Sequence, residues 1–319
     1  MRVHLTYDVE IWCNGWKGLR EKFPDAFQRY VYGPPEAKEN GALPLNLKIL
    51  QDNGLKAIFF VEPLFSFYFG LPPLQEIVGL ILEAGQDVQL HLHPEWLDEL
   101  PEPLLPSHPK LQHFYNLPLA EQVLLLELAA SRLVEAGARK PTAFRAGNYA
   151  IDISTLKALS INGFTVDSSV NPSYPFDYPA NPSSRLYYCS RIENIAEFPV
   201  TQFRDNFGKL RHLQINACSS QEMIQVLKRC HERGLPAATL VSHNFELLTA
   251  NKAKIDIIVR SRFERLCQWL GKNAEQFECA PFDPNGLPDS PPVWEVPRVS
   301  PISTAIRYIE QFTRRILYN

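Results

Sequence analysis

The stretch Asp87-Val-Gln-Leu-His-Leu-His-Pro-Glu-Trp96 alternates polar and apolar residues up to its second histidine, as a β-strand does when one face is buried. Successive side chains of a strand point to opposite faces, so His91 and His93 are expected on one side of a sheet. Pro94 is expected to end the strand. Two neighbouring imidazoles at a strand end are typical either of a metal site or of a hydrogen-bonded histidine pair, and this stretch alone does not separate the two.

The segments on both sides of this stretch repeat an alternation of strand and helix. Strands are expected over seven segments, namely 3–8, 56–61, 87–93, 142–145, 164–167, 197–200 and 238–242. Helical spacing, mostly closed by a glycine, occurs over 43–53, 73–84, 119–136, 151–162, 220–233 and 254–276. This order is typical of parallel strands covered by helices, and we predict one closed or nearly closed β/α barrel.

Long loops and a terminal helix complete the expected organisation. The segments 10–41, 98–118 and 171–191 are rich in proline or in mixed polar and aromatic residues, which predicts loops. No change in composition marks a boundary, so residues 1–319 are expected to form a single domain with a C-terminal extension from about residue 279. The extension ends in an amphipathic helix over 302–318. Its basic face is modest, which favours packing on the barrel over binding to a membrane.

The composition argues against several classes of protein. A net charge of −3 and a pI near 6.3 give no electrostatic basis for nucleic acid as a partner. The six cysteines include no Cys-x-x-Cys pair, and the first residues lack the apolar run of a signal peptide. No segment approaches the ~18 apolar residues of a transmembrane segment. We therefore expect a cytoplasmic protein, whose oligomeric state the sequence leaves open.

Charged residues collect at the carboxyl ends of the expected strands. In a β/α barrel, these ends and their loops form the active site. The residues at these positions are Asp8, Glu10, His91, His93, Arg145, Asp167 and His243. Each alone has a structural explanation, such as a helix cap, an internal ion pair or a buried histidine. Three carboxylates, three histidines and an arginine at one end of a barrel favour a catalytic site.

The order of these segments resembles the motifs of the polysaccharide deacetylases, the NodB homology domain of carbohydrate esterase family 4. The similar segments are Thr6-Tyr-Asp-Val-Glu10, Ala57-Ile-Phe-Phe-Val61, the histidine stretch at His91, Phe144-Arg-Ala-Gly-Asn-Tyr149, Asp167-Ser-Ser169 and Leu240-Val-Ser-His243. The resemblance covers roughly residues 1 to 250. It implies a distorted (β/α)7 barrel and a metal-dependent hydrolase that removes N-acetyl groups.

Two departures from the family pattern affect the expected site. The first motif usually has adjacent aspartates, whereas Val9 separates Asp8 from Glu10 here; on an extended strand this spacing puts both carboxylates on one face. The second motif is usually His-x-x-x-His, but the residue four after His91 is Glu95. Either His93 or Glu95 replaces the missing histidine. The strand pattern favours His93, because it places this residue beside His91.

The resemblance implies a metal centre. Glu10, His91 and His93 would hold a divalent metal, and three protein ligands leave the open position that a catalytic zinc requires. Two nitrogens and one oxygen also suit iron, cobalt or nickel, so the sequence favours zinc without fixing it.

The resemblance also implies roles for the remaining charged residues. Asp8 would be the general base that takes a proton from water, and His243 the general acid that protonates the leaving amine. Arg145 would orient Asp8. Asp167 would tune or position the histidine.

The expected substrate is an N-acetylated sugar, oligosaccharide or lipid-linked glycan, and the lack of an export signal favours an intermediate of glycan biosynthesis. Trp12, Trp16, Trp96 and Tyr174 in the expected loops are candidates for platforms on which sugar rings stack. Two other hypotheses stay open. One is a hydrolase of C–N bonds in a small non-sugar amide, and the other is a carbohydrate-binding relic that has lost its metal.

Overall fold

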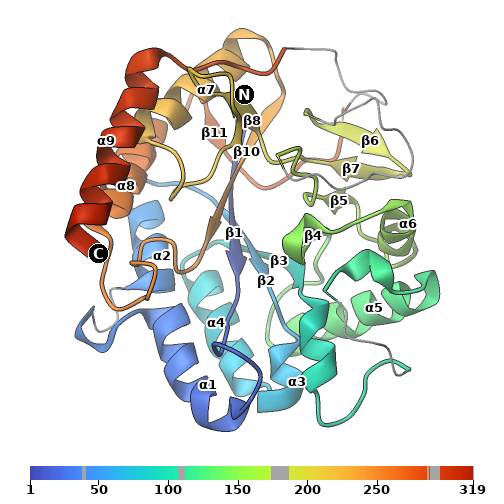
Figure 1. Ribbon diagram of the computed structural model, residues 1–319. Coiled ribbons are helices and arrows are strands. Elements are labelled where there is room, and N and C mark those ends of the chain that lie inside the picture. Colours follow the sequence, from blue (N-terminus) through green and yellow to red (C-terminus); the bar gives the residue numbers. More distant parts are fainter. Residues whose placement is uncertain (38–40, 107–111, 174–186, 286, 288–294, 319) are drawn as a thin grey trace. The chain divides into compact units, whose positions relative to one another are not determined.

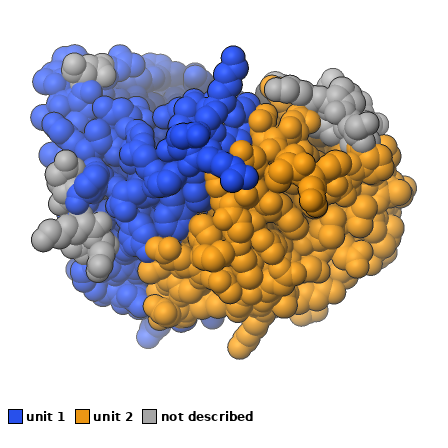
Figure 2. Space-filling view, turned by 90° about the horizontal axis from the view of Figure 1, so that it is seen from below, with its two compact units in different colours: residues 1–57, 201–281, 293–319 blue, residues 58–200, 282–292 orange. Residues whose placement is uncertain are grey.

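The computed structural model describes the whole chain except residues 38–40, 107–111, 174–186, 286, 288–294 and 319 (Figure 1). The described residues fall into two units, which Figure 2 colours separately. Unit 1 combines residues 1–57, 201–281 and 293–319, and unit 2 combines residues 58–200 and 282–292. The prediction of one domain over residues 1–319 concerns how these units fold together, and it stays a prediction.

Unit 1 contains two parallel strands from distant parts of the sequence. Strands β1 (Arg2–Val9) and β10 (Ala237–His243) pair in a register that places Asp8 opposite His243. A short strand, β11 (Glu278–Cys279), pairs with the start of β1. Because parallel strands end at the same edge, the last residues of β1 and β10 are neighbours.

Helices and a hairpin complete unit 1. The helices are α1 (Leu19–Phe27), α2 (Ala42–Asp52), α7 (Ser220–Glu232), α8 (Ile257–Lys272) and α9 (Pro301–Tyr318). The hairpin pairs β8 (Gln202–Arg204) with β9 (Leu210–His212). Ser219 and Asp256 cap α7 and α8 by accepting backbone N–H bonds, which explains where these helices begin. Among the described residues, no helix has both the length and the apolar composition needed to cross a membrane.

Unit 2 contains a row of parallel strands. Their order is β2 (Ile58–Val61), β3 (Asp87–Leu92), β4 (Ala143–Ala146), β5 (Val166–Asp167) and β7 (Ile195–Glu197), and β6 (Ser190–Ile192) runs antiparallel to β7. The helices are α3 (Phe65–Phe69), α4 (Pro72–Glu83), α5 (Leu119–Glu135) and α6 (Ile153–Ile161). The residues of β2 and β4 are all buried, as expected for parallel strands covered on both faces.

All seven expected strands occur, as do the expected helices, but one expected loop is wrong. Residues 10–41 contain α1 and a π-helical turn over Gln28–Tyr32. Glycine and proline suggested a loop here, and Pro24 indeed lies inside α1. Leu19, Phe23 and Ala26, at spacings of four and three residues, are the buried face of this helix. Their burial outweighs the helix-breaking effect of Pro24. The strand expected at 197–200 lies two residues earlier, as β7.

Candidate functional site

The end of β1 is held in place by one buried asparagine. The N–H of Asn244 donates to the carbonyl oxygen of Asp8 (3.3 Å), and its side-chain Oδ1 accepts the N–H of Glu10 (3.1 Å). Its Nδ2 donates to the carbonyl oxygen of Tyr30 (2.6 Å). Asp8 and Glu10 are both buried. Asn244 therefore fixes the backbone that carries both carboxylates, at the same edge as His243.

His243 lies between two carboxylates of unit 1. Its Nδ1 is 2.8 Å from Oε1 of Glu246, and its Nε2 is 3.9 Å from Oε1 of Glu10. Burial alone would lower the pKa of His243. The hydrogen bond to Glu246 and the charges of Glu10, Glu246 and Asp8 outweigh burial and raise the pKa to about 9. The imidazole is therefore protonated at neutral pH.

Glu246 is a site residue that the strand-end reasoning missed. Its buried carboxylate accepts hydrogen bonds from Gln214 Nε2 (2.5 Å), the N–H of Asn216 (3.2 Å) and Ser242 Oγ (3.3 Å), in addition to its contact with His243. Three donors besides the imidazole hold it in one orientation. The sequence signal for this contact is an acidic residue three positions after His243, because a turn there brings the two side chains together.

The carboxylates and the imidazole of unit 1 form a compact group. Asp8, Glu10 and His243 each offer one ligand atom, and these atoms lie within 4.8 Å of one another. Such a group is a candidate metal site. A metal ion would compete with the proton for the imidazole of His243, because metals bind the lone pair of neutral imidazole. The same group can also move protons, with Glu10 as a candidate metal ligand.

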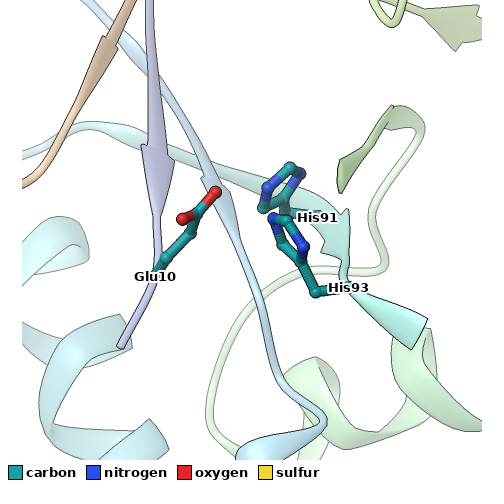
Figure 3. Close-up of side chains that lie close together, drawn as sticks. All are labelled: Glu10, His91 and His93. Carbon is teal, nitrogen blue, oxygen red and sulfur yellow. The ribbon is translucent and has the colours of Figure 1, made fainter. Parts of the chain in front are cut away.

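The two imidazoles of unit 2 lie against each other at the end of β3, as the strand pattern predicted (Figure 3). Their ring centroids are 4.9 Å apart, and both side chains are buried. Nδ1 of His91 is 2.7 Å from the carbonyl oxygen of Arg145. A carbonyl only accepts, so this nitrogen carries the hydrogen and Nε2 carries the lone pair. Such an orientation is typical of a metal-binding histidine.

Glu95 orients His93. One of its oxygens, Oε2, lies 3.2 Å from Nδ1 of His93, and the other, Oε1, accepts a hydrogen bond from Asn148 Nδ2 (3.1 Å). A carboxylate bonded to Nδ1 leaves Nε2 of the imidazole as the nitrogen that offers a lone pair. This geometry supports His93 over Glu95 as the candidate ligand, with Glu95 as its support.

Arg145 is fully buried at the end of β4. Its Nε donates to the carbonyl oxygen of Ser168 (2.9 Å), and its Nη2 donates to Ser168 Oγ (2.9 Å). Its guanidinium also lies 4.4 Å from the ring centroid of Phe60, a cation–π distance. These contacts fix the side chain, while its expected role in orienting Asp8 stays a prediction.

Asp167 faces Glu197 across β5 and β7, and both residues are fully buried. Asp167 accepts hydrogen bonds from Ser169 Oγ (2.7 Å) and Ser169 N–H (3.0 Å). Burial raises the pKa of Asp167, and burial together with the nearby Asp167 charge raises the pKa of Glu197 well above its usual range. Burial of this pair therefore favours the protonated form of Glu197. The role of Asp167 toward the histidine stays a prediction, since the carboxylate on Nδ1 of His243 is Glu246.

We expect Glu197→Gln to raise the free energy of unfolding at pH 8. Because folding raises the pKa of Glu197, its favourable contribution is complete below the unfolded-chain pKa near 4.3 and is lost as pH rises through the folded pKa. Glutamine has the same size but no charge to bury. The unfolding temperature should rise by a few degrees at pH 8, at about 2–4 °C per kcal/mol.

The same substitution should change the unfolding temperature little near pH 4. Glu135→Gln, on the exposed side of α5, is the matched control and should have little effect at either pH. An equal gain at both pH values would mean that burial of charge is not the cause.

The aromatic residues expected to stack on sugar rings lie in different surroundings. Trp96 is buried among Phe65 and Phe69, so the prediction that it stacks on a sugar is wrong. Trp12 donates its Nε1–H to Oε2 of Glu10 (2.7 Å) and meets Trp16 edge to face, which keeps this pair beside the carboxylates. Tyr174 lies outside the described residues.

Comparisons with known proteins identify the fold. No family profile and no curated protein matches the sequence. A provisionally assigned polysaccharide deacetylase from Mycobacterium smegmatis aligns with 93% of this chain and 94% of its own, at 16% identity and a TM-score of 0.52. The 4-alpha-glucanotransferase from Thermococcus litoralis aligns with 87% of this chain and 38% of its own, at 11% identity and a TM-score of 0.51. A family 4 carbohydrate esterase from Streptomyces lividans, in complex with acetate, aligns at 16% identity and a TM-score of 0.45 over 91% and 97%.

Identities this low establish a shared fold and nothing about activity. The fold is the distorted β/α barrel of the polysaccharide deacetylase type, as the sequence predicted. The glucanotransferase shows that the same fold occurs in a protein named for a different activity. Function must therefore be argued from the site.

Proposed function

We propose that this protein is a metal-dependent hydrolase that removes N-acetyl groups from a sugar, oligosaccharide or lipid-linked glycan. One observation carries the proposal, namely a group of two buried carboxylates, Asp8 and Glu10, and a half-buried, protonated imidazole, His243, at the carboxyl ends of β1 and β10. Amide hydrolysis needs a base, a charge that holds the developing oxyanion, and an acid for the leaving amine. This group offers the first and the last.

Glu10, His91 and His93 are the residues we assign to the metal, and Figure 3 draws these three side chains. The donor types fit a divalent cation, because the hydrogen bonds at Nδ1 leave Nε2 as the ligand atom of each imidazole. A zinc ion bound there would lower the pKa of its water and polarise the carbonyl oxygen of the substrate. His91 and His93 are held for this task by Arg145 and Glu95.

Asp8 is the proposed general base and His243 the proposed general acid. Asp8 is a buried carboxylate beside the proposed ligand Glu10, which suits a group that takes a proton from water. The proton on His243 is available to a leaving amine. Glu246 holds the imidazole by Nδ1, so that Nε2 is the nitrogen directed toward Glu10 and the reaction. Arg145 as the group that orients Asp8, and Asp167 as a supporting carboxylate, belong to the same proposal.

The proposed setting is a reducing compartment such as the cytoplasm. None of the six cysteines, all of which are among the described residues, forms a disulfide. A substrate made inside the cell, such as a biosynthetic glycan intermediate, suits this setting.

Metal content and acetate release test the proposal together. Purified protein loaded with zinc should hold one equivalent and release acetate from N-acetylglucosamine oligosaccharides, and a chelator should stop the release. His91→Ala should lose both metal and activity, whereas Lys48→Ala, on the exposed side of α2, should lose neither. A zinc-loaded protein that releases ammonia from small amides but no acetate would overturn the substrate class. Protein that retains no metal would support a non-catalytic relic.

Gly147→Ala should weaken metal binding by about 10–100-fold, the usual cost of disturbing a group that supports a ligand. A Cβ at Gly147 would lie 2.6 Å from Cε1 and Nδ1 of His93, so the imidazole would have to move. Calorimetric titration of the metal-free protein with zinc measures the change. Gly79→Ala is the control, because its Cβ would meet nothing within 4 Å. Equal zinc affinity in both variants would contradict His93 as a ligand.

A further inference from the structure

Helix α9 carries a continuous row of exposed apolar side chains. Ile302, Ile309, Phe312 and Ile316 are 72%, 65%, 65% and 67% exposed. Thirteen large apolar side chains are exposed among the described residues, and six of them lie on this helix, while no other helix carries more than three. Single exposed apolar residues are ordinary, but a continuous patch marks a surface that another molecule covers.

The opposite face of α9 is fixed to unit 1, which determines where the apolar row points. Arg307 is buried, with Nε 2.9 Å from Glu222 and Nη2 3.1 Å from Asp205. One turn from the C-terminal end, Arg314 Nε is 2.7 Å from Asp256. The helix lies against α7 and α8 through these ion pairs (Figure 1). It cannot rotate to bury the apolar row without breaking them.

The spacing of the row suits a second helix of the same kind. The exposed positions Ile302, Ala305, Ile309, Phe312 and Ile316 follow one another at intervals of three, four, three and four residues. This is the interval of helices that pack side by side along a continuous seam. A second copy of the chain presents the same row, and a twofold axis would match each row to the other in antiparallel orientation.

The charges of α9 argue against a lipid surface. Helices that lie on membranes carry lysine and arginine on their polar side, where these residues contact anionic lipid. Here Arg307 and Arg314 are bound by carboxylates of unit 1. Arg315 is the single charged residue among the exposed positions of α9. The row is therefore apolar with almost no basic border, as expected for a contact between protein chains.

The apolar row extends beyond the helix itself. Phe207, 73% exposed, lies edge to face with Tyr308 at 6.1 Å and widens the row. Three isoleucines, Phe207 and Phe312 each expose 65% or more of their surface, and Tyr308 exposes 48%. Stable complexes bury roughly 800 Å² per partner, and this row would form the apolar centre of such an interface. We propose that α9, with Phe207, is the interface of a homodimer in which two copies of α9 pack antiparallel. This inference does not depend on the proposed activity.

The oligomeric state of the full chain tests the proposal. Light scattering during gel filtration and sedimentation velocity, at about 1 to 100 µM, should give the mass of a dimer that dissociates on dilution. Ile309→Glu and Phe312→Glu each place a charge in the middle of the seam and should give a monomer over the same range. Both positions are exposed in one chain, so circular dichroism and the unfolding temperature of the diluted monomer should be unchanged.

A matched control and a second partner complete the experiment. Ile161→Glu alters an equally exposed isoleucine on α6 and should leave the dimer intact. A monomer at every concentration would overturn the proposal, as would a dimer that persists in both α9 variants. Sedimentation with vesicles of phosphatidylcholine and phosphatidylglycerol tests a lipid surface. Binding to vesicles by a monomeric wild type, lost in Ile309→Glu, would also overturn it.

Discussion

Asp8→Asn will lower kcat for acetate release by about 10²–10⁴-fold, the usual contribution of a general base, while the zinc content stays at one equivalent. Asparagine keeps the size of the buried side chain and its hydrogen-bonding ability, but it cannot take a proton from water. The backbone of residue 8 is fixed by its pairing with β10 and by the N–H of Asn244, so the substitution should not displace it. Steady-state acetate release and metal analysis of the same preparation measure the two effects.

Asp52→Asn is the matched control for this variant. Asp52 is an exposed aspartate of α2 that pairs with Lys48, and its loss should change neither kcat nor metal content. If Asp8→Asn instead lost its zinc, Asp8 would be a metal ligand rather than the base. This result would favour the set of Asp8, Glu10 and His243 as the metal site.

Glu246→Gln will lower kcat by about 10–100-fold, a range typical of groups that orient a reactive residue, and will leave KM nearly unchanged. The hydrogen bond and charge of Glu246 help to raise the pKa of His243 to about 9. Without that charge, the pKa of His243 should fall, so the acid should lose its proton at lower pH. The basic limb of the profile of kcat against pH should therefore move to lower pH. In the metal-free protein, NMR titration of His243 should show the same direction of change.

Two further variants separate this effect from a loss of structure. Glu246→Asp keeps the charge and should restore part of the basic limb, which a merely structural role would not predict. Glu275→Gln, at an exposed position after α8, should leave the profile unchanged. A lower kcat with an unmoved basic limb in Glu246→Gln would show that Glu246 does not act through His243.

The fold could be predicted from sequence because its signals are local. The seven expected strands are short runs of apolar and β-branched residues, and each is found among the parallel strands of unit 1 or unit 2. Helix α1 was missed because residues 10–41 are aromatic and charged and contain Gly33-Pro34-Pro35, whereas the burial of Leu19, Phe23 and Ala26 makes part of this segment helical. That burial is a tertiary effect, which no local pattern contains.

The candidate site was predictable in part for a similar reason. Residues at strand ends meet at one edge of a parallel sheet, so Asp8 and His243 could be grouped before their distance was known. Glu246 could not be grouped with them, since its contact depends on the turn after β10. Glu197 was missed as well, because its pairing with Asp167 depends on the register between β5 and β7. Contacts of this kind are decided by the path of the chain in three dimensions.

The pairing of β1 with β10 determines how late in synthesis on the ribosome the proposed base and acid can come together. Arg2 pairs with Ala237, so the first strand is synthesised more than two hundred residues before its partner exists. The ladder of unit 2, from β2 to β7, is complete by Glu197. Long loops close slowly, and contacts between distant residues form late. Asp8 and His243 therefore meet only after the parallel strands of unit 2 have been made, and a nascent chain that stops short of β10 cannot assemble the proposed base and acid.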